Sequence, residues 1–417
     1  MTGVEEAKHM TDKVNLSVVV CLVLCGAFAC PVAEAQSRSG LIESARTEKE
    51  ANLTPERPPR LERKVVWAKK SVLYGLLTGD VEGIGVGFGT IVPGSGFAIG
   101  PQYKRTDLWG ERLTLNVEAR AAANKSYIGR LDLSLPRLFG DRGFLDFSTV
   151  RRDISEMPYY GAGPDSQKTG RSNYRLEDSN IEIRPGFRPY RGFRTGAIGS
   201  FLAVNLGPGH SNRYISSEQQ FGPDVAPGIE HQTNFWRGGG FVEYDWRDRL
   251  SHRNSGGKYS AQYVRYLDHN LGRYSFMRVD LDAVQYVPLF NHSRVITVHG
   301  SSSLTDTNAS QSVPFYLQPT LGGPNTLRGY RVGRFYGNNS VMVNGEYRWE
   351  ASPILDVVTF VDAGKVFDRW EQWNLHRMER DVGFGFRLKM RSRVVFSFDT
   401  GFSHEGFQIW FRVNNMF

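Results

Sequence analysis

The chain has 417 residues, a formal net charge of +8 at pH 7 and a mean hydropathy of −0.39. Beyond the N-terminal segment it contains no run of about 18 apolar residues, which excludes a transmembrane helix there. The negative mean hydropathy does not exclude a membrane protein, because the strands of a transmembrane β-barrel alternate apolar and polar residues and an average cancels this alternation.

Residues 1–35 are predicted to be a secretory signal peptide. Lys8 and Lys13 precede an apolar stretch over residues 14–32, and alanines at 33 and 35 form a cleavage site. The apolar core is too short for a membrane helix and ends in small residues, as in a signal peptide. Acidic residues among the first twelve positions are unusual in a leader, so the start is left open between Met1 and Met10.

All three cysteines, Cys21, Cys25 and Cys30, lie in this leader. A lipid-modified Cys30 is an alternative, although the residues before it match a lipoprotein signal poorly. An exported chain without disulfides takes its stability from burial, a closed sheet or lipid. The leader contains two lysines and four acidic residues, so its removal raises the net charge to +10. After export, this charge favours anionic outer-membrane lipid over nucleic acid as a partner.

Residues 36–80 are predicted to be a periplasmic linker with a short helical segment. Residues 36–64 are polar and contain three prolines, which is typical of a linker. Residues 65–78 could form an amphipathic helix or a segment that meets the membrane face.

From about residue 83 onward, apolar residues alternate with polar or small ones, which predicts β-strands. The pattern predicts sixteen of them, near residues 83–91, 94–104, 111–123, 125–135, 142–155, 173–190, 192–206, 232–247, 257–268, 273–288, 293–303, 339–351, 354–367, 380–390, 393–402 and 406–417. We therefore predict an all-β fold, a transmembrane antiparallel β-barrel of 16 strands over residues 81–417, whose closure removes exposed edges. A soluble sandwich is the alternative, because alternation alone does not separate the two.

Loop lengths support the barrel. Short links at 391–392 and 403–405 alternate with long loops at 156–172, 207–231, 304–338 and 368–379. This asymmetry is expected of short periplasmic turns and long external loops.

A Gly-rich loop carrying Leu327-Arg328-Gly329-Tyr330 leads directly into the strand at 339–351. On that strand the residues of one face are polar or large, and those of the other are mostly apolar or aromatic. The first face has Met342, Asn344, Glu346 and Arg348, and the second has Val341, Val343, Gly345, Tyr347 and Trp349. One face suits a wet lumen and the other suits lipid.

The tetrad and its following strand resemble the signature of the BamA/TamA-type, or bacterial surface antigen, superfamily of outer-membrane assembly and secretion barrels. Three further stretches are similar to motifs of this family, in the family's order: Glu243-Tyr-Asp-Trp-Arg-Asp248 followed by Gly256, Gly257 and Tyr259, then Glu346-Tyr347-Arg348, then Phe360-Val-Asp-Ala-Gly364. The resemblance is specific over residues 235–417 and is a generic barrel pattern over 80–234.

The resemblance implies that the long loop before the twelfth strand folds into the lumen, where its arginine bonds carboxylates on the wall. Carried over, Arg328 is that arginine. By face counting, Glu346 and Asp362 project inward on adjacent strands and are its best partners. Asp280 and Asp282 are alternative partners, and a solvated Arg328 on a surface loop is the alternative to docking.

The remaining motif residues complete this predicted loop–wall interaction. Gly329 would permit a tight turn that brings the arginine to the wall. Tyr330, Arg348 and Gly364 belong to the same motifs and are assigned to the same interaction.

The last strand ends in Phe417, and a terminal aromatic residue on an alternating strand resembles the outer-membrane insertion signal. The residues expected on its lipid face are Phe407, Ile409, Phe411 and Val413. Asn415 departs from the usual apolar choice.

Glycines at every second position from 83 to 89 are predicted to form a wall strand with small inward residues, and a weak seam where the first strand meets the last. A phosphate loop is the alternative, but Thr90-Ile-Val-Pro93 follows in place of a helix.

Enzyme signals are poor, because the chain lacks a G-x-S-x-G elbow, an H-E-x-x-H pair and a paired-cysteine site. His299 with Ser301–Ser303 is the one hint of catalysis. We predict no enzymatic activity, no cofactor and no metal. Five aromatic residues near strand ends are expected to form an interface belt: Trp109, Tyr244, Trp246, Trp349 and Trp410.

The resemblance thus implies a monomeric barrel in the outer membrane of a Gram-negative-type bacterium, acting in protein insertion or secretion, with pairing of the first and last strands. Assembly and secretion members of the family carry periplasmic transport-associated domains, and residues 36–80 are too few for one. Client capture would then depend on a separate periplasmic partner protein. A passive pore or structural barrel without a protein client is the alternative.

Overall fold

A computed structural model describes residues 42–43, 45–49, 83–211, 213–248, 255–290, 293–374, 376–390 and 393–413. The predicted leader, the segment at 65–78 and Phe417 lie outside these residues. Residues 42–43 and 45–49 are helical.

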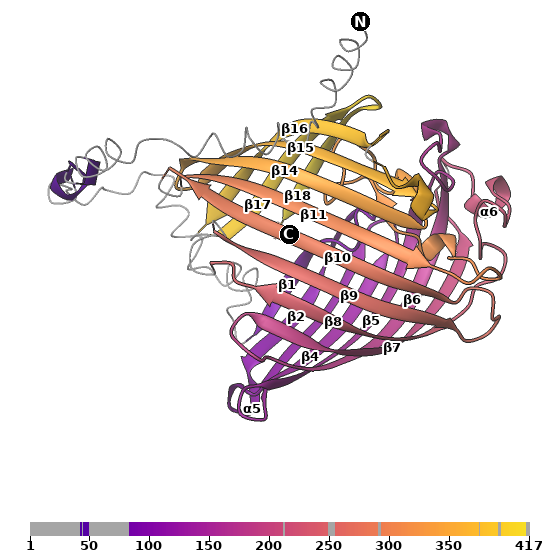
Figure 1. The fold of residues 1–417 in the computed structure, drawn as a ribbon, viewed down its shortest axis with the longest axis horizontal. Coiled ribbons are helices and arrows are strands. Elements are labelled where there is room, and N and C mark those ends of the chain that lie inside the picture. The colour runs from indigo at the N-terminus through magenta and orange to yellow at the C-terminus, as the bar shows by residue number, and fades with distance from the viewer. Residues whose placement is uncertain are drawn as a thin grey trace, which may run out of the picture. The chain divides into compact units, whose positions relative to one another are not determined.

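The described part of the chain from residue 84 forms one antiparallel sheet of sixteen strands, in which each strand pairs with the next along the chain (Figure 1). The strands are β1 (Ile84–Thr90), β2 (Phe97–Asp107), β3 (Leu113–Ala122), β4 (Tyr127–Leu138), β5 (Gly143–Tyr159), β6 (Ser172–Phe187), β7 (Phe193–Pro208), β8 (Phe235–Asp245), β9 (Gly256–Asp268), β10 (Phe276–Leu289), β11 (Arg294–Asp306), β14 (Asn339–Ser352), β15 (Leu355–Phe367), β16 (Glu379–Met390), β17 (Arg393–Ser403) and β18 (Gly406–Val413). The predicted number and order of strands are confirmed.

The two faces of the sheet confirm a membrane barrel over a soluble sandwich. On β16, Val382, Phe384 and Phe386 point outward and are exposed, whereas Asp381 and Arg387 point inward and are buried. A soluble sandwich would bury the apolar face and expose the polar one. The reverse arrangement is that of a lipid-facing wall around a polar interior.

The first and last strands meet without pairing. β1 and β18 are in contact, but no ladder hydrogen bonds join them among the described residues. Gly85 and Gly87 of β1 point inward and are buried. This edge is where the glycine pattern predicted a seam.

The connections differ at the two ends of the barrel (Figure 1). Short turns at 108–112, 139–142, 188–192 and 353–354 lie at one end, where β8, β10 and β16 also end. The long loops at 160–171, 209–234, 307–338 and 368–378 lie at the other, and they contain η1 (Lys168–Gly170), α6 (Ser217–Gln220), η2 (Phe315–Leu317) and η3 (Trp370–Gln372). The short link between β17 and β18 also lies at the long-loop end, so its predicted place among the periplasmic turns was wrong. α5 (Leu108–Glu111) is a left-handed turn, because Trp109 and Gly110 have positive φ.

An aromatic cluster fills the lumen at the long-loop end. Tyr159 of β5 packs against Phe315 and Tyr336 of the 307–338 loop, with ring centroids 4.9 Å apart in each pair. Tyr174 of β6 packs against Phe315 at the same distance. Burial of these rings stabilises the loop inside the barrel. The loop also contains a two-stranded sheet, β12 (Thr320–Leu321) with β13 (Phe335–Tyr336).

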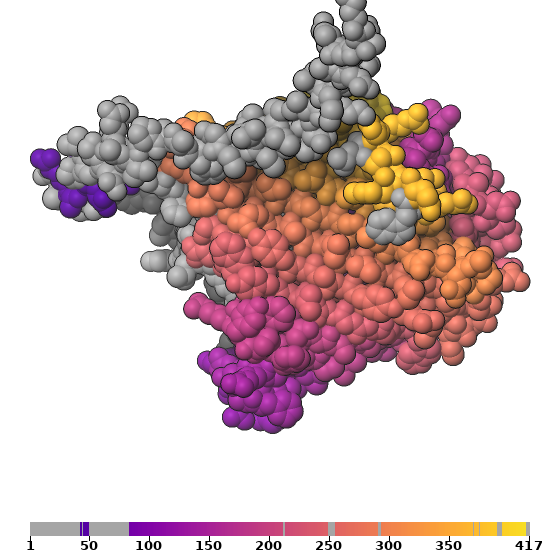
Figure 2. Space-filling model, in the orientation of Figure 1, coloured from indigo at the N-terminus to yellow at the C-terminus, as the bar shows by residue number. Residues whose placement is uncertain are grey.

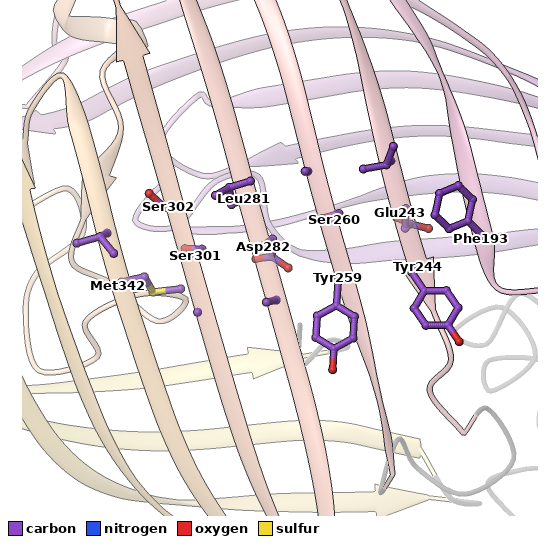
Figure 3. Close-up of a pocket in the computed structure, with 15 residues that line it drawn as sticks. Phe193, Glu243, Tyr244, Tyr259, Ser260, Leu281, Asp282, Ser301, Ser302 and Met342 are labelled. Carbon is purple, nitrogen blue, oxygen red and sulfur yellow. The ribbon is translucent and has the colours of Figure 1, made fainter. Parts of the chain in front are cut away.

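The outer wall forms a continuous surface over the strands coloured magenta to orange (Figure 2). A shallow groove of about 510 Å³ crosses β8 to β14, where Ala261, Ala283 and Gly300 leave space beside larger neighbours. Figure 3 shows Tyr244 of β8 beside Tyr259 of β9, with both hydroxyls directed toward the short-turn end. No helix in the described part of the chain is long and apolar enough to cross a membrane.

Candidate functional site

Arg328 lies inside the barrel on the loop between β12 and β13, with only 3% of its side chain exposed. Its Nε donates to Oδ2 of Asp362 at 2.8 Å and its Nη2 donates to Oδ1 at 2.7 Å. Its Nη1 donates to Oε2 of Glu346 at 2.8 Å. The guanidinium therefore makes a bidentate contact with one wall carboxylate and a single contact with the next, which is a strong charge-assisted arrangement.

The strand period places these partners. Glu346 of β14 and Asp362 of β15 lie on the inner face, two rungs apart in the register of the two strands. Phe360 of β15, directly opposite Glu346 in this register, lies under the guanidinium, with Cζ of Arg328 3.4 Å from the ring centroid. A desolvated cation over an aromatic face adds further stabilisation, of about 2 kcal/mol.

The wall supplies further arginines to the same network. Nη1 of Arg387 on β16 donates to Oδ1 of Asp399 at 2.7 Å, and its Nη2 lies 3.4 Å from Oε2 of Glu346. Arg412 of β18 donates to Oδ2 of Asp399. Charges of opposite sign thus alternate across the inner wall from β16 to β18. Each of these charges has a partner, which is the condition for a buried network to be tolerated, but Asp381 of β16 is also buried here and neither of its carboxylate oxygens is hydrogen-bonded within the described part of the chain.

The electrostatics keep Arg328 charged. Burial alone would lower the pKa of Arg328, but the hydrogen bonds and negative charges of Asp362 and Glu346 raise it above its usual range.

Gly329 allows the loop to touch the wall. A Cβ on Gly329 would lie 2.5 Å from Cβ of Asp381, and a Cβ on Gly401 of β17 would lie 2.5 Å from the carbonyl carbon of Arg328. Two facing glycines therefore bring the loop backbone directly against the sheet. The predicted tight turn is present with Arg328 and Gly329 at its centre, where the backbone N–H of Tyr330 donates to the carbonyl oxygen of Leu327 at 3.1 Å, but Gly329 is not among the residues with positive φ. Glycine is needed at position 329 because the loop backbone approaches the wall closely, and not because the turn requires a positive φ.

Two side chains of the wall donate hydrogen bonds to backbone carbonyl oxygens of the loop. Nε1 of Trp410 on β18 donates to the carbonyl oxygen of Arg328 at 2.7 Å. Oγ of Ser403 donates to the carbonyl oxygen of Gly329 at 2.9 Å. Trp410 was therefore wrongly assigned to the interface belt, since it faces the lumen. The belt aromatics Trp109, Tyr244, Trp246 and Trp349 are exposed on the outside.

Two more loop residues bind near the tips of the wall strands. The hydroxyl of Tyr330 donates to Oε2 of Glu379 at 2.6 Å, and burial together with Glu379 raises the pKa of Tyr330 above its usual range. Nε of Arg334 donates to Oε1 of Glu405 at 2.8 Å. Its Nη1 donates to Oγ of Ser166, on the 160–171 loop, at 2.9 Å.

The other assigned motif residues separate into two groups. Gly364 of β15 lies beside the loop, because a Cβ there would be 3.0 Å from Leu321 Cδ1. Arg348 points inward nearer the short-turn end, where its Nε lies 3.9 Å from Oδ2 of Asp356.

Each of the two alternative carboxylates bonds another residue of the inner wall. Asp280 accepts from Oγ of Ser303 at 2.6 Å, and Asp282 pairs with Nε2 of His299 at 2.7 Å. His299 therefore faces the lumen, away from the lipid side on which a lipase would need it. No cluster of His, Cys, Asp and Glu that could hold a metal occurs in the described ranges.

The lipid face of β18 matches the count from Phe417. Phe407, Ile409 and Phe411 are exposed, and Val413 is half-buried. Phe417 itself lies outside the described residues, so the insertion signal stays a prediction.

These features define the class of protein: a transmembrane β-barrel with a loop docked against its inner wall. Residues 109–402 match the Omp85 superfamily domain, and the chain belongs to the Omp85 superfamily. It is an outer-membrane protein of the Gram-negative type.

Two solved structures share the fold. BamA from Haemophilus ducreyi lacking POTRA domains 1-3 is 17% identical, with a TM-score of 0.59 over 79% of this chain and 68% of that one. CdiB from Escherichia coli is 12% identical, with a TM-score of 0.55 over 79% of this chain and 61% of that one. The chain thus spans about three fifths of the CdiB chain. No curated protein matches it by sequence.

Proposed function

We propose that the chain inserts proteins into the outer membrane or moves them across it, without enzymatic chemistry, through the seam between β1 and β18. The observation that carries the proposal is the docking of Arg328 onto β15 and β14, within a network that extends to β18 at the seam. A loop held in this way links the plug of the lumen to the strand that must move if the seam opens. A separate periplasmic protein that delivers the client belongs to the same proposal.

Cysteine cross-linking of the seam tests the proposal. The three cysteines all lie in the predicted leader, so the mature chain offers a background without thiols. Cysteine pairs are introduced in turn along β1 and β18, and insertion of a second barrel into vesicles is measured before and after oxidation. We expect a cross-linked seam to stop insertion and a reducing agent to restore it.

A pair within the closed part of the wall provides the matched control. Val242 of β8 and Ala261 of β9 face each other on the outer side, and a cross-link between cysteines there should leave insertion unchanged. Full insertion by every seam-locked variant would refute the proposed route.

A passive pore is the second candidate, because charged side chains such as Glu118, Asp178 and Arg237 line the inner wall away from the loop. Ion conductance that a locked seam does not alter, together with no client insertion, would favour the pore.

A further inference from the structure

The short turns expose large apolar side chains. In the described residues of six links at the short-turn end there is one such side chain at or beside the tip: Trp109, Phe139, Tyr190, Trp246, Phe290 and Ile354. Phe139 is 89% exposed and Trp109 is 74% exposed. Figure 1 shows this end of the barrel at the label α5, opposite α6. Packing within the fold does not account for side chains that are this exposed.

Three of these residues hold a backbone conformation that aromatic residues seldom adopt. The φ angles of Trp109, Phe139 and Phe290 are 53°, 51° and 46°. In two of the turns a glycine follows and is also left-handed, in the repeated sequences Leu108-Trp109-Gly110 and Leu138-Phe139-Gly140. A left-handed conformation is unfavourable for a residue with a Cβ. The repetition of an unfavourable, exposed aromatic residue indicates a role outside the fold.

Arginines accompany the aromatic residues, and they lack carboxylate partners. Among the described residues, no Asp or Glu oxygen forms an ion pair with the arginines of this set: Arg112, Arg142, Arg188, Arg191 and Arg294. Burial and the charge of Arg194 lower the pKa of Arg188, although Asp146 and Asp141 act in the opposite direction. The short-turn end therefore presents these five arginines without an ion-pair partner, although acidic residues such as Asp141, beside Arg142, lie in the same turns.

A groove opens on the outer wall beside two of these residues. It has a volume of about 600 Å³ and is lined by Phe139, Arg142, Gly143, Gly186, Phe187 and Gly196, with three other residues. Gly186 and Gly196 pair with each other in its floor, where added Cβ atoms would come within 2.4 and 2.2 Å of backbone oxygens of the neighbouring strand. Arg142 is the charged residue of this otherwise largely apolar groove.

We propose that this groove binds an anionic phospholipid of the inner leaflet, with an acyl chain along the glycine floor and the phosphate on Arg142. The groove faces lipid, because Phe187 and its outward neighbours on β6 form the exposed apolar wall. Aromatic residues favour the depth of the headgroups, and basic residues near the surface attract anionic lipid. The groove across β8 to β14 shares the aromatic part of this chemistry, with the hydroxyls of Tyr244 and Tyr259 directed toward the same end, but none of its described lining residues is basic (Figure 3).

An acidic protein partner would also suit unpaired arginines. A protein would have to reach a groove on the lipid side of the wall, whereas a phospholipid already lies there. The geometry therefore favours lipid, and this proposal stands whether or not the chain inserts clients.

Vesicle composition tests the site. The mature protein is reconstituted into phosphatidylcholine vesicles with or without phosphatidylglycerol, and the temperature of barrel unfolding is read from gel migration. We expect phosphatidylglycerol to raise that temperature, Arg142→Gln to remove most of the rise, and Arg142→Lys to keep it. Ala197→Leu, which fills the groove without changing charge, should also reduce the rise. Inorganic phosphate should not replace the lipid.

Arg151→Gln is the matched control, because Arg151 lies on β5, the strand that follows the turn of Arg142, toward the other end of the barrel, where it contacts Ser179 and Glu177. It removes the same charge and should leave the lipid effect unchanged. An equal loss in the Arg142 and Arg151 variants would reduce the effect to general charge and overturn the proposal. So would an unchanged lipid effect in Arg142→Gln combined with loss of a periplasmic protein cross-linked to this rim in cells, which would identify a protein-docking surface.

Discussion

Replacing Arg328 with alanine should detach the 307–338 loop from the wall, because it leaves two buried carboxylates without their shared cation. Asp362 and Glu346 have 0% and 5% of their side chains exposed. Breaking a buried ion pair by removing one partner costs about 3–5 kcal/mol. We expect the free energy of barrel unfolding to fall by about this amount.

Removal of Arg328 should affect the two carboxylates unequally, because they keep different contacts. Asp362 receives two of the three guanidinium contacts and keeps only the backbone N–H of residue 328. Glu346 retains Nη2 of Arg387 at 3.4 Å. In double-mutant cycles with alanine we therefore expect a coupling energy of about 3 kcal/mol for Arg328 with Asp362, and about 1 kcal/mol for Arg328 with Glu346.

The cycles are measured by urea unfolding of the barrel in vesicles. Maleimide labelling of a cysteine placed at Thr326, whose carbonyl oxygen accepts from Asn344, reports separately on loop release. Strict additivity in both cycles would show that the contacts contribute nothing as pairs, and the docking account would fail. Equal coupling energies of Arg328 with Asp362 and with Glu346 would show that Arg387 does not compensate Glu346 for the loss of Arg328.

Three further changes test the same arrangement. Gly329→Ala should release the loop, since its Cβ would lie 2.5 Å from Cβ of Asp381, whereas Gly207→Ala, with open space at its Cβ, should not; protease sensitivity of the loop distinguishes them. Trp410→Phe removes one hydrogen bond to the loop and should lower the unfolding free energy by about 1 kcal/mol in the urea assay. Deletion of Phe417 should lower the amount of heat-modifiable barrel in the outer membrane, and unchanged amounts would argue against an insertion signal.

The wall could be predicted from the sequence because a strand has a period of two. Once Phe384 and Phe386 face lipid, Asp381 and Arg387 must face the lumen, and the register follows from short turns. The same counting places Glu346 and Asp362 inward on neighbouring strands. It also placed Asp399 and Arg387 on inner faces, although their ion pair was not anticipated.

The loop contacts could not be predicted in the same way, because the loop residues do not alternate between apolar and polar as strand residues do. Trp410 lies on the lumen side by parity, but its type and its place near a strand end favoured a membrane interface. Its role depends on the carbonyl oxygen of Arg328, 82 residues away in the chain. The contact of Gly329 with Asp381 likewise exists only after the barrel has closed around the loop.

The paired glycines explain how a charged tetrad can dock on a sheet at all. An arginine side chain reaches the wall from a distance, but the backbone of Arg328 and Gly329 also contacts β17 and β18, through Ser403 and Trp410. Those contacts need both Gly329 and Gly401 to lack side chains. The loop is thus held by charge on the β14–β15 side and by backbone contact on the β17–β18 side.

Movement of β18 at the seam would break the backbone contacts to β17 and β18 first, while the contacts of Arg328 with Asp362 and Glu346 could persist. Loop release and seam opening should therefore be separable, with Trp410→Phe affecting the seam and Arg328→Ala affecting both.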